Sequence, residues 1–211
     1  MPLQSFQVCE LIETEYGTAR IAVLALDTEQ NGFSYDLIVK DLESGQLLPV
    51  LILNTDGEVA FDKLAGFYYT QVDPTGRGAR VFRHQLGTDH RAADILIYDE
   101  SQNPDFSVSV AQSASKELIL MNVKSTFKPR CNETWVRRAD YDFEEGNLGK
   151  RNKFWLVSPM QAGVTYDVKH SGEFLYKLTN EGTQDASHFK LDKIRMPDVL
   201  KQDSYKKAQE F

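Results

Sequence analysis

Four short apolar runs follow one another between residues 81 and 125, and turn-forming residues separate each run from the next. The runs cover residues 81–86, 94–98, 106–111 and 118–123. They are rich in β-branched and aromatic residues, and Gly, Asn, Pro, Ser and Asp cluster in the gaps between them. Runs of this length and composition are typical of β-strands in hairpin succession. The stretch therefore predicts a chain built from antiparallel strands.

Pairs of such runs recur along the whole chain, each pair followed by a turn. They cover residues 21–27 with 33–42, 66–72 with 79–86, 106–111 with 118–123, and 173–179 with 188–192. Ile38 and Phe82 lie 44 residues apart, and Phe82 and Leu120 lie 38 apart. A period of about 40–45 residues with several strands per unit is typical of propeller blades. The 69 residues from Leu120 to Phe189 indicate an insertion.

We therefore predict an all-β fold, a partial β-propeller of about four blades of antiparallel strands over residues 1–196. Residues 47–53 and 94–98 are candidate outer strands of the blades. The charged segment 137–153 lacks a clear period and is the predicted insertion, and residues 197–211 form a C-terminal tail with few apolar residues. A β-sandwich, in which turns recur every 8–12 residues or so, is the alternative.

Composition restricts the class of partner. The 211 residues include 24 Lys and Arg against 31 Asp and Glu, a net charge of −7, which argues against nucleic acid. Cys9 and Cys131 lie far apart and indicate no disulfide framework. The first residues do not resemble a signal peptide, and no apolar run reaches the roughly 20 residues of a membrane helix. We expect a cytoplasmic protein without a membrane partner.

The serines do not form a hydrolase motif. A nucleophile elbow has the pattern Gly-x-Ser-x-Gly, and none of the 13 glycines lies in one. Ser113 and Ser115 are flanked by Gln112 and Lys116, without the glycine that a strained turn requires. We expect both serines to be structural.

The four histidines, His84, His90, His170 and His188, lack the spacing of metal ligands. His84 alternates with Phe82 and Leu86, so the three side chains share a strand face. We expect His84 to be half-buried and bonded to a neighbour. Residues 89–90 with Asp94 are a weak alternative metal site in a polar turn.

Two further patterns favour structural interpretations. Residues 76–80 are basic and glycine-rich, but a strand follows them and not the helix that a phosphate loop requires. We expect a hairpin tip with its turn at residues 73–76. Residues 132–134 match the glycosylation sequon, which without a secretory signal carries no modification. The residues thus predict no catalytic group, no cofactor and no metal, and so a binding or scaffold role.

The stretch 81–125 also carries a family resemblance. Residues 82–88 read aromatic-Arg-His-x-Leu-Gly-Thr, and residues 97–100, 106–109 and 115–116 continue the pattern. This stretch resembles the propeller of the prolyl oligopeptidase family of serine peptidases, and within it the oligopeptidase B branch. Residues 165–168 with 174–180 are similar to the next blade, and 33–45 to the preceding one. The resemblance covers about residues 21–196.

The resemblance implies a role in gating. In that family a seven-bladed propeller caps an α/β-hydrolase domain, so that short peptides reach a Ser-Asp-His triad, and cleavage follows Arg or Lys in one branch and Pro in another. No position of this chain matches a triad residue. We therefore expect the propeller portion of a serine oligopeptidase, inactive alone, whose partner is a hydrolase domain in cis or in trans. The alternative is a stand-alone propeller-like interaction module without enzymatic activity.

An incomplete propeller has a physical consequence. Its first and last blades expose strand edges and one apolar face each, which invite association with other chains. We expect a fragment, a truncated gene product, or half of a two-chain assembly.

Overall fold

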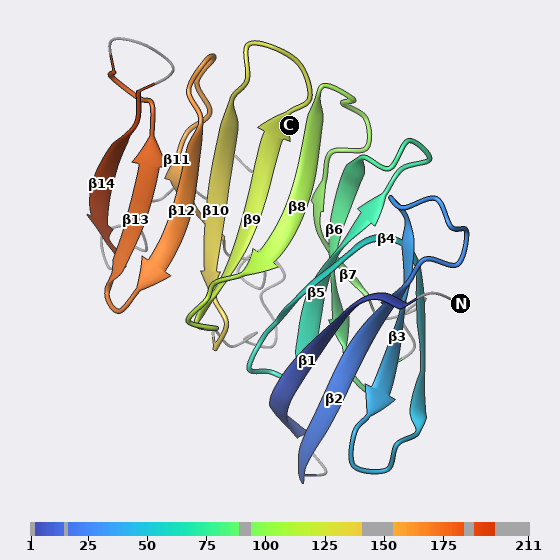
Figure 1. Cartoon of the computed structure of the whole chain (residues 1–211). Helices are drawn as coiled ribbons and strands as arrows, with labels where there is room; N and C mark the ends of the chain where they lie inside the picture. Colours follow the sequence, from blue (N-terminus) through green and yellow to red (C-terminus); the bar gives the residue numbers. More distant parts are fainter. Residues whose placement is uncertain (1–2, 15–16, 89–93, 141–153, 184–187, 197–211) are drawn as a thin grey trace. The chain divides into compact units, whose positions relative to one another are not determined.

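The computed structural model describes residues 3–14, 17–88, 94–140, 154–183 and 188–196, and β-strands joined by turns and loops make up this part of the chain (Figure 1). The strands are β1 (Leu3–Thr14), β2 (Gly17–Leu26), β3 (Tyr35–Asp41), β4 (Leu47–Phe61), β5 (Gly66–Val72), β6 (Gly78–Gln85), β7 (Ile95–Asp99), β8 (Phe106–Gln112), β9 (Leu118–Ser125), β10 (Asn132–Arg138), β11 (Trp155–Ser158), β12 (Tyr166–Ser171), β13 (Phe174–Thr179) and β14 (Lys190–Arg195). No helix in this part of the chain is long and apolar enough to cross a membrane.

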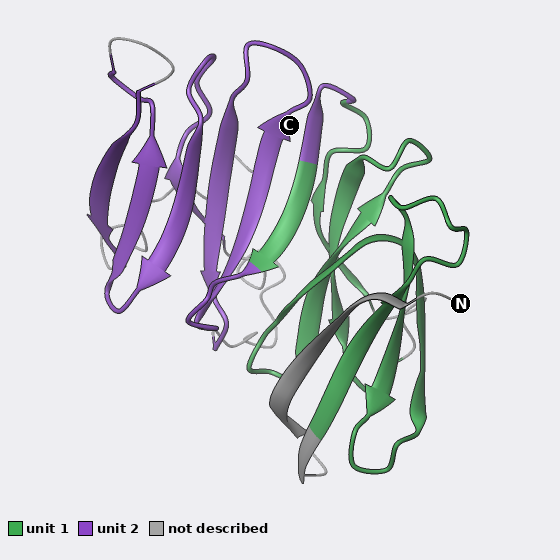
Figure 2. Cartoon of the chain, viewed as in Figure 1, with its two compact units in different colours: residues 1–103, 108–111 green, residues 104–107, 112–211 purple. Residues whose placement is uncertain are grey.

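The strands pair with their neighbours in sequence. Strands β1 to β7 form one sheet in chain order, and all six pairings in it are antiparallel. A second sheet has the order β11-β10-β9-β8, and a third has the order β12-β13-β14. The chain divides into two compact units, the first of residues 1–103 with 108–111 and the second of residues 104–107 with 112–211 (Figure 2).

A bend in β4 divides the seven-stranded sheet into two blades. Leu51 and Ile52 pair with β3, whereas residues 59–61 pair with β5. Between them, Asn54 (φ 58°) and Gly57 (φ 85°) adopt left-handed conformations that turn the strand from one blade into the next. We define blade 1 as β1–β3 with residues 47–53, blade 2 as residues 55–61 with β5–β7, blade 3 as β8–β11, and blade 4 as β12–β14. This division confirms the predicted four antiparallel blades.

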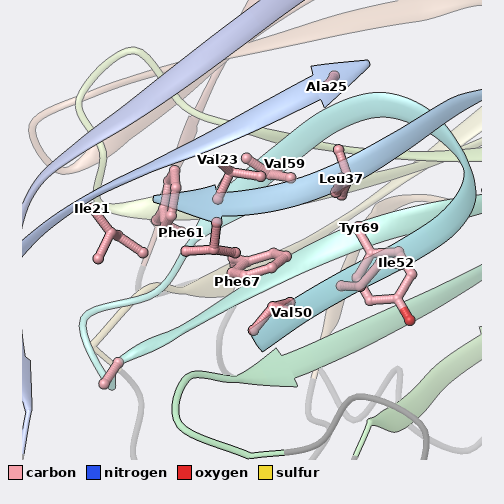
Figure 3. Close-up of a cluster of buried hydrophobic side chains, with 12 residues drawn as sticks. Ile21, Val23, Ala25, Leu37, Val50, Ile52, Val59, Phe61, Phe67 and Tyr69 are labelled. Atoms are coloured by element: carbon pink, nitrogen blue, oxygen red, sulfur yellow. The ribbon is translucent and has the colours of Figure 1, made fainter. Parts of the chain in front are cut away.

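Blades 1 and 2 share an apolar core in the first unit (Figure 3). Leu37 and Val39 of β3, Phe67 of β5, and other alternate residues of these strands are buried because one face of each strand points into this core. Phe61 and Phe67 meet edge to face with ring centroids 5.9 Å apart. The core contains Ile21, Val23, Ala25, Leu37, Val39, Val50, Ile52, Val59, Phe61, Ala65, Phe67 and Tyr69.

Blades 3 and 4 share a second core in the other unit. It contains Leu118, Leu120, Val136, Trp155, Val157, Tyr166, Val168, Leu175 and Met196. Tyr166 of β12 also makes polar contacts with blade 3, because its hydroxyl accepts a bond from Thr134 N (2.7 Å) and donates one to Ser158 O (2.7 Å). Burial raises the pKa of Tyr166 to about 12. The core of the first unit therefore packs blade 1 on blade 2, and that of the second unit packs blade 4 on β9–β11 of blade 3.

The predicted strand pairs correspond to β2–β3, β5–β6, β8–β9 and β13–β14. The predicted outer strands 47–53 and 94–98 fall in β4 and β7. Arg137 and Arg138, the first residues of the predicted charged insertion, end β10. Residues 141–153 and the predicted tail 197–211 lie outside the described residues.

Gly78 of β6 tests the packing of β6 against β8. A Cβ at Gly78 would clash with the backbone carbonyl of Val108, and backbone cannot move aside as a side chain can. We expect Gly78→Ala to lower the free energy of unfolding by about 3 kcal/mol. Gly45→Ala is the control, because its Cβ meets nothing within 4 Å and only the positive φ of 71° costs about 1 kcal/mol. Urea denaturation measures the free energy of unfolding of both variants. An equal loss in the two would contradict the close packing of Gly78 on Val108.

Candidate functional site

Blade 2 holds a buried ion pair at the turn between β4 and β5. Arg83 of β6 donates from Nε to Asp62 Oδ2 at 2.6 Å, and the two side chains are 4% and 2% exposed. Asp62 Oδ1 accepts bonds from Leu64 N and Gly66 N, both at 2.9 Å. Arg83 Nη2 also donates to Leu64 O at 3.3 Å. The pair therefore fixes the turn onto the neighbouring strand.

His84, next in β6, lies in a buried polar group. Its Nδ1 lies 2.7 Å from Asp94 Oδ1, and Tyr69 OH donates to Asp94 Oδ2 at 2.7 Å. Burial, and then the bond to Asp94, raises the pKa of Tyr69 far above its usual range. His84 is 0% exposed, so the expected bond to a neighbour is present, but the expected half burial is wrong. The side chain is enclosed because its ring also packs on Phe67, with centroids 5.2 Å apart.

The weak alternative metal site combined Asp94 with residues 89–90, which lie outside the described part of the chain. Asp94 itself contacts His84 and Tyr69. Over the residues that the structure describes, no group of three or more His, Cys, Asp or Glu side chains is placed to hold a metal ion.

Ser115 meets a histidine in the second unit. Its Oγ lies 2.7 Å from His170 Nδ1 and 2.9 Å from Ser113 Oγ. Glu117 Oε2 lies 3.6 Å from the same His170 nitrogen. In an acyl-transfer triad the serine and the acid contact opposite nitrogens of the imidazole, so that a proton taken at one side is balanced at the other. Because both groups here face Nδ1, the cluster cannot act as such a relay.

The serines instead close a turn. Ser113 Oγ accepts a bond from Leu118 N at 3.0 Å, and Ser113 N donates to Leu118 O at 2.9 Å. Through His170 of β12, the turn between β8 and β9 is tied to blade 4. This geometry favours the structural role expected for Ser113 and Ser115.

The basic glycine-rich patch forms the tip of the β5–β6 hairpin, as predicted. Gly76 N donates to Asp73 O at 2.9 Å, and Arg77 Nε donates to Asp73 Oδ2 at 2.9 Å. Arg77 Nη1 also donates to Glu100 O (3.1 Å) and Asn103 O (3.2 Å). Arg80 contacts Asp99 at 3.1 Å. Arg77 therefore holds the turn in place, and Arg80 links β6 to β7.

Asp56, at the bend of β4, has a strongly perturbed carboxyl group. Burial raises its pKa from 3.8 to about 6, although bonds from Glu58 N and from the Thr70 side chain act in the opposite direction. Thr70 Oγ1 in turn accepts a bond from Val110 N at 3.2 Å. This burial could not be predicted from the sequence, because Asn54, Asp56 and Gly57 together resemble an exposed turn.

Antiparallel sheets that pack on one another through apolar cores are compatible with the class of β-propeller domains, whose blades are such sheets. The family model described as the prolyl oligopeptidase N-terminal β-propeller domain matches residues 22–204. The chain therefore belongs to this family, through its N-terminal propeller. This result confirms the resemblance drawn from residues 81–125.

Individual relatives agree with this assignment. Protease 2 of Moraxella lacunata is 26% identical over 168 residues, which are 78% of this chain and 22% of that protein. The structure of oligopeptidase B from Leishmania major has a TM-score of 0.70 and 23% identity, with 96% of this chain and 26% of that chain covered. Prolyl oligopeptidase B from Galerina marginata, as the apo protein, has a TM-score of 0.57 and 15% identity over 95% of this chain and 28% of that chain.

These structural similarities show the shared fold. The chain spans about a quarter of the length of the relatives that it matches, and it does not cover their catalytic domain. The propeller assignment also rejects the β-sandwich alternative.

The buried pair of Arg83 and Asp62 can be tested by removing one partner. Asp62→Ala removes the carboxylate that the buried Arg83 guanidinium and two backbone amides bind, so we expect a loss of about 3–5 kcal/mol in the free energy of unfolding. Asp140→Ala is the matched control, because its pair with Arg138 at 2.8 Å is 53% and 41% exposed and contributes about 1 kcal/mol or less. Denaturant unfolding measures the free energy of unfolding of both variants. Similar losses would show that burial does not determine how strongly the ion pair stabilises the fold.

Asp56 predicts a pH dependence of stability. An acid whose pKa is raised on folding binds its proton more tightly in the folded state, so stability is lost as the pH rises from about 4 to about 6. Asp56→Asn removes this cost, and we expect it to raise the stability at pH 7 by about 2 kcal/mol and to leave that at pH 4 nearly unchanged.

Asp41→Asn is the control, because the Asp41 carboxyl group changes the stability with pH in the opposite direction. Bonds from Glu43 N, the Ser44 side chain and Ser44 N lower the pKa of Asp41, so its carboxylate stabilises the fold above pH 4 and the contribution is lost as the pH falls. Urea unfolding across this pH range measures both variants. If the free energy of unfolding of the wild-type chain falls between pH 4 and 6 and that of Asp56→Asn falls equally, the burial of Asp56 would be contradicted.

Proposed function

We propose that this chain is the substrate-gating portion of a serine oligopeptidase and that it docks on an α/β-hydrolase domain that supplies the Ser-Asp-His triad. The observation that carries the proposal is the match of the family's propeller over residues 22–204. The names of the relatives, a protease and two oligopeptidases, support it. Short peptides are the substrates proposed for the whole enzyme.

The polar chemistry of the chain is consistent with a lid and not with a catalyst. Its buried carboxylates are engaged with arginine, histidine, tyrosine and backbone amides that hold turns and strands together. In the described residues, Ser115 hydrogen-bonds to His170. The acid beside this pair faces the same imidazole nitrogen as the serine, whereas in a triad it contacts the opposite nitrogen. Restriction of access needs a rigid shape and no reactive group.

We expect the purified chain to leave fluorogenic dipeptides ending in Arg or Lys uncleaved. The measurement is the release of fluorophore with and without a serine-directed phosphonate, with Ser115→Ala measured in parallel. Turnover that the phosphonate blocks would contradict the proposal. If Ser115→Ala also abolished that turnover, Ser115 would be the nucleophile.

Gating can be tested in a chimaera in which residues 22–204 replace the matched segment of the Moraxella protease. We expect cleavage of short basic peptides to persist and that of long, unfolded substrates to stay low. The control is the catalytic domain of that protease without its propeller, which lacks the barrier to long substrates. A chimaera as active on long substrates as this control would argue against gating.

A further inference from the structure

The first unit contains a pocket between three of its connections. The loop that joins β2 to β3, the bend of β4 and the tip of the β5–β6 hairpin form its walls, with Glu29, Phe33, Asn54 and Asp73 among the lining residues. We call it the loop pocket. Its volume is about 330 Å³, at the lower end of the range of about 300–1,000 Å³ for small-molecule sites. A pocket of this size fits a single long side chain or a ligand of similar size.

Phe33 forms an aromatic wall of the loop pocket. A Cβ built on Gly76 would lie 2.7 Å from Phe33 Cδ2, so the ring packs directly on the hairpin tip. The Phe33 side chain is nevertheless 45% exposed. The tip therefore supports the ring while much of its surface stays open to a ligand.

Hydrogen bonds hold the loop that carries Phe33 in one shape. The Asp27 carboxylate accepts bonds from Asn31 N (3.0 Å) and Gly32 N (3.1 Å). Asn31 Oδ1 in turn accepts bonds from Phe33 N (3.0 Å) and Ser34 N (2.9 Å). A loop braced in this way is preformed, so a ligand does not have to order it on binding.

Glu29 supplies a carboxylate with an available acceptor atom. Its Oε2 accepts a bond from Asn31 Nδ2 at 3.1 Å, which orients the group. Among the residues that the structure describes, none donates a hydrogen bond to Glu29 Oε1 or forms an ion pair with Glu29. A carboxylate oxygen of this kind binds a cationic donor more strongly than a neutral one.

The second carboxylate of the loop pocket already has a cation. Asp73 Oδ2 accepts a bond from Arg77 Nε at 2.9 Å, and Asp73 Oδ1 accepts bonds from the backbone nitrogens of Thr75 (2.9 Å) and Arg77 (3.1 Å). These bonds compensate the charge of Asp73 within its own turn. The charge that remains for a ligand is that of Glu29.

The walls of the loop pocket contain no competing cation. No lysine, arginine or histidine lines it in the described part of the chain. Residues 21–39 contain Asp27, Glu29 and Asp36 but no Lys or Arg. The groups that bond to Asp27 and Asp36 are backbone amides and a threonine hydroxyl, which are neutral. The local field therefore favours a positively charged ligand.

The aromatic wall discriminates between kinds of cation. A lysine ammonium is a compact, strongly hydrated point charge, whereas an arginine guanidinium is planar and less strongly hydrated. A guanidinium can lie flat on an aromatic ring while the N–H groups at its edge donate to a carboxylate. The loop pocket supplies both partners, the ring of Phe33 and the carboxylate of Glu29.

We propose that the loop pocket binds the side chain of an arginine in a peptide, with the guanidinium on the ring of Phe33 and an N–H group donating to Glu29 Oε1. The volume fits the side chain, so the peptide backbone stays at the mouth of the pocket. The proposal uses only residues of the first unit, and it does not rest on the hydrolase role proposed above.

Titration of the full chain with Nα-acetyl-arginine amide, followed by NMR of the backbone amides, tests the binding. We expect saturable shifts of the Gly32 and Gly76 signals, which adjoin Phe33, with a dissociation constant of about 1 mM, a value suited to one side chain. The signal of Gly45 in the β3–β4 turn should not move. Shifts that do not saturate by about 10 mM would overturn the proposal.

Two analogues test which property of the ligand is recognised. Nα-acetyl-citrulline amide has nearly the same shape without the charge, and Nα-acetyl-lysine amide keeps the charge without the plane. We expect each to bind at least about fivefold more weakly than the arginine compound. Equal affinity of either analogue would contradict recognition of a guanidinium.

A pair of acidic variants locates the site. We expect Glu29→Gln to raise the dissociation constant of the arginine compound about tenfold, because a charge-assisted hydrogen bond is lost. Glu43→Gln is the matched control, because Glu43 is exposed in the β3–β4 turn of the same blade and its replacement removes the same charge. Equal weakening by the two variants would show general attraction to an acidic surface, and the proposal would fail.

Phe33→Leu tests the aromatic wall, since it keeps an apolar side chain and removes the ring. We expect the preference for the arginine compound over the lysine compound to disappear, while the lysine compound binds as it does to the wild-type chain. Amide signals far from the pocket monitor the fold of the variant. A folded Phe33→Leu chain that retains the preference would show that the ring does not select the guanidinium, contrary to the proposal.

Discussion

The face-to-face packing of neighbouring blades is the constraint on which the rest of this structure depends. A single four-stranded sheet cannot bury its own side chains, so each blade is stable only against another one. Blades 1 and 2 achieve this through the core around Leu37 and Phe67, and blades 3 and 4 through the core around Val136 and Leu175. The alternation of buried and exposed residues along β3 and β12 follows from this requirement, because one face of each strand must be buried.

Polar groups then determine how the blades are held in register. Apolar packing has no preferred direction, so it tolerates sliding of one sheet over another, whereas a buried hydrogen bond is lost when its partners separate. Tyr166 links β12 to both Thr134 and Ser158, and Asp62 holds Arg83 together with two backbone amides. These groups are buried and hydrogen-bonded, which explains how several titratable side chains are accommodated inside the chain.

The sequence predicted those parts of the fold in which local pattern and tertiary environment agree. Strand β5 was found with its bounds because aromatic residues run through it between two turns. Strand β10 was partly assigned to a charged insertion because Arg137 resembles a surface residue, although it is 1% exposed. The burial of Asp56 was not predicted, because its neighbours resemble an exposed turn. In the structure they form a bend within a sheet. In both cases the local sequence does not reveal that the polar side chain is buried.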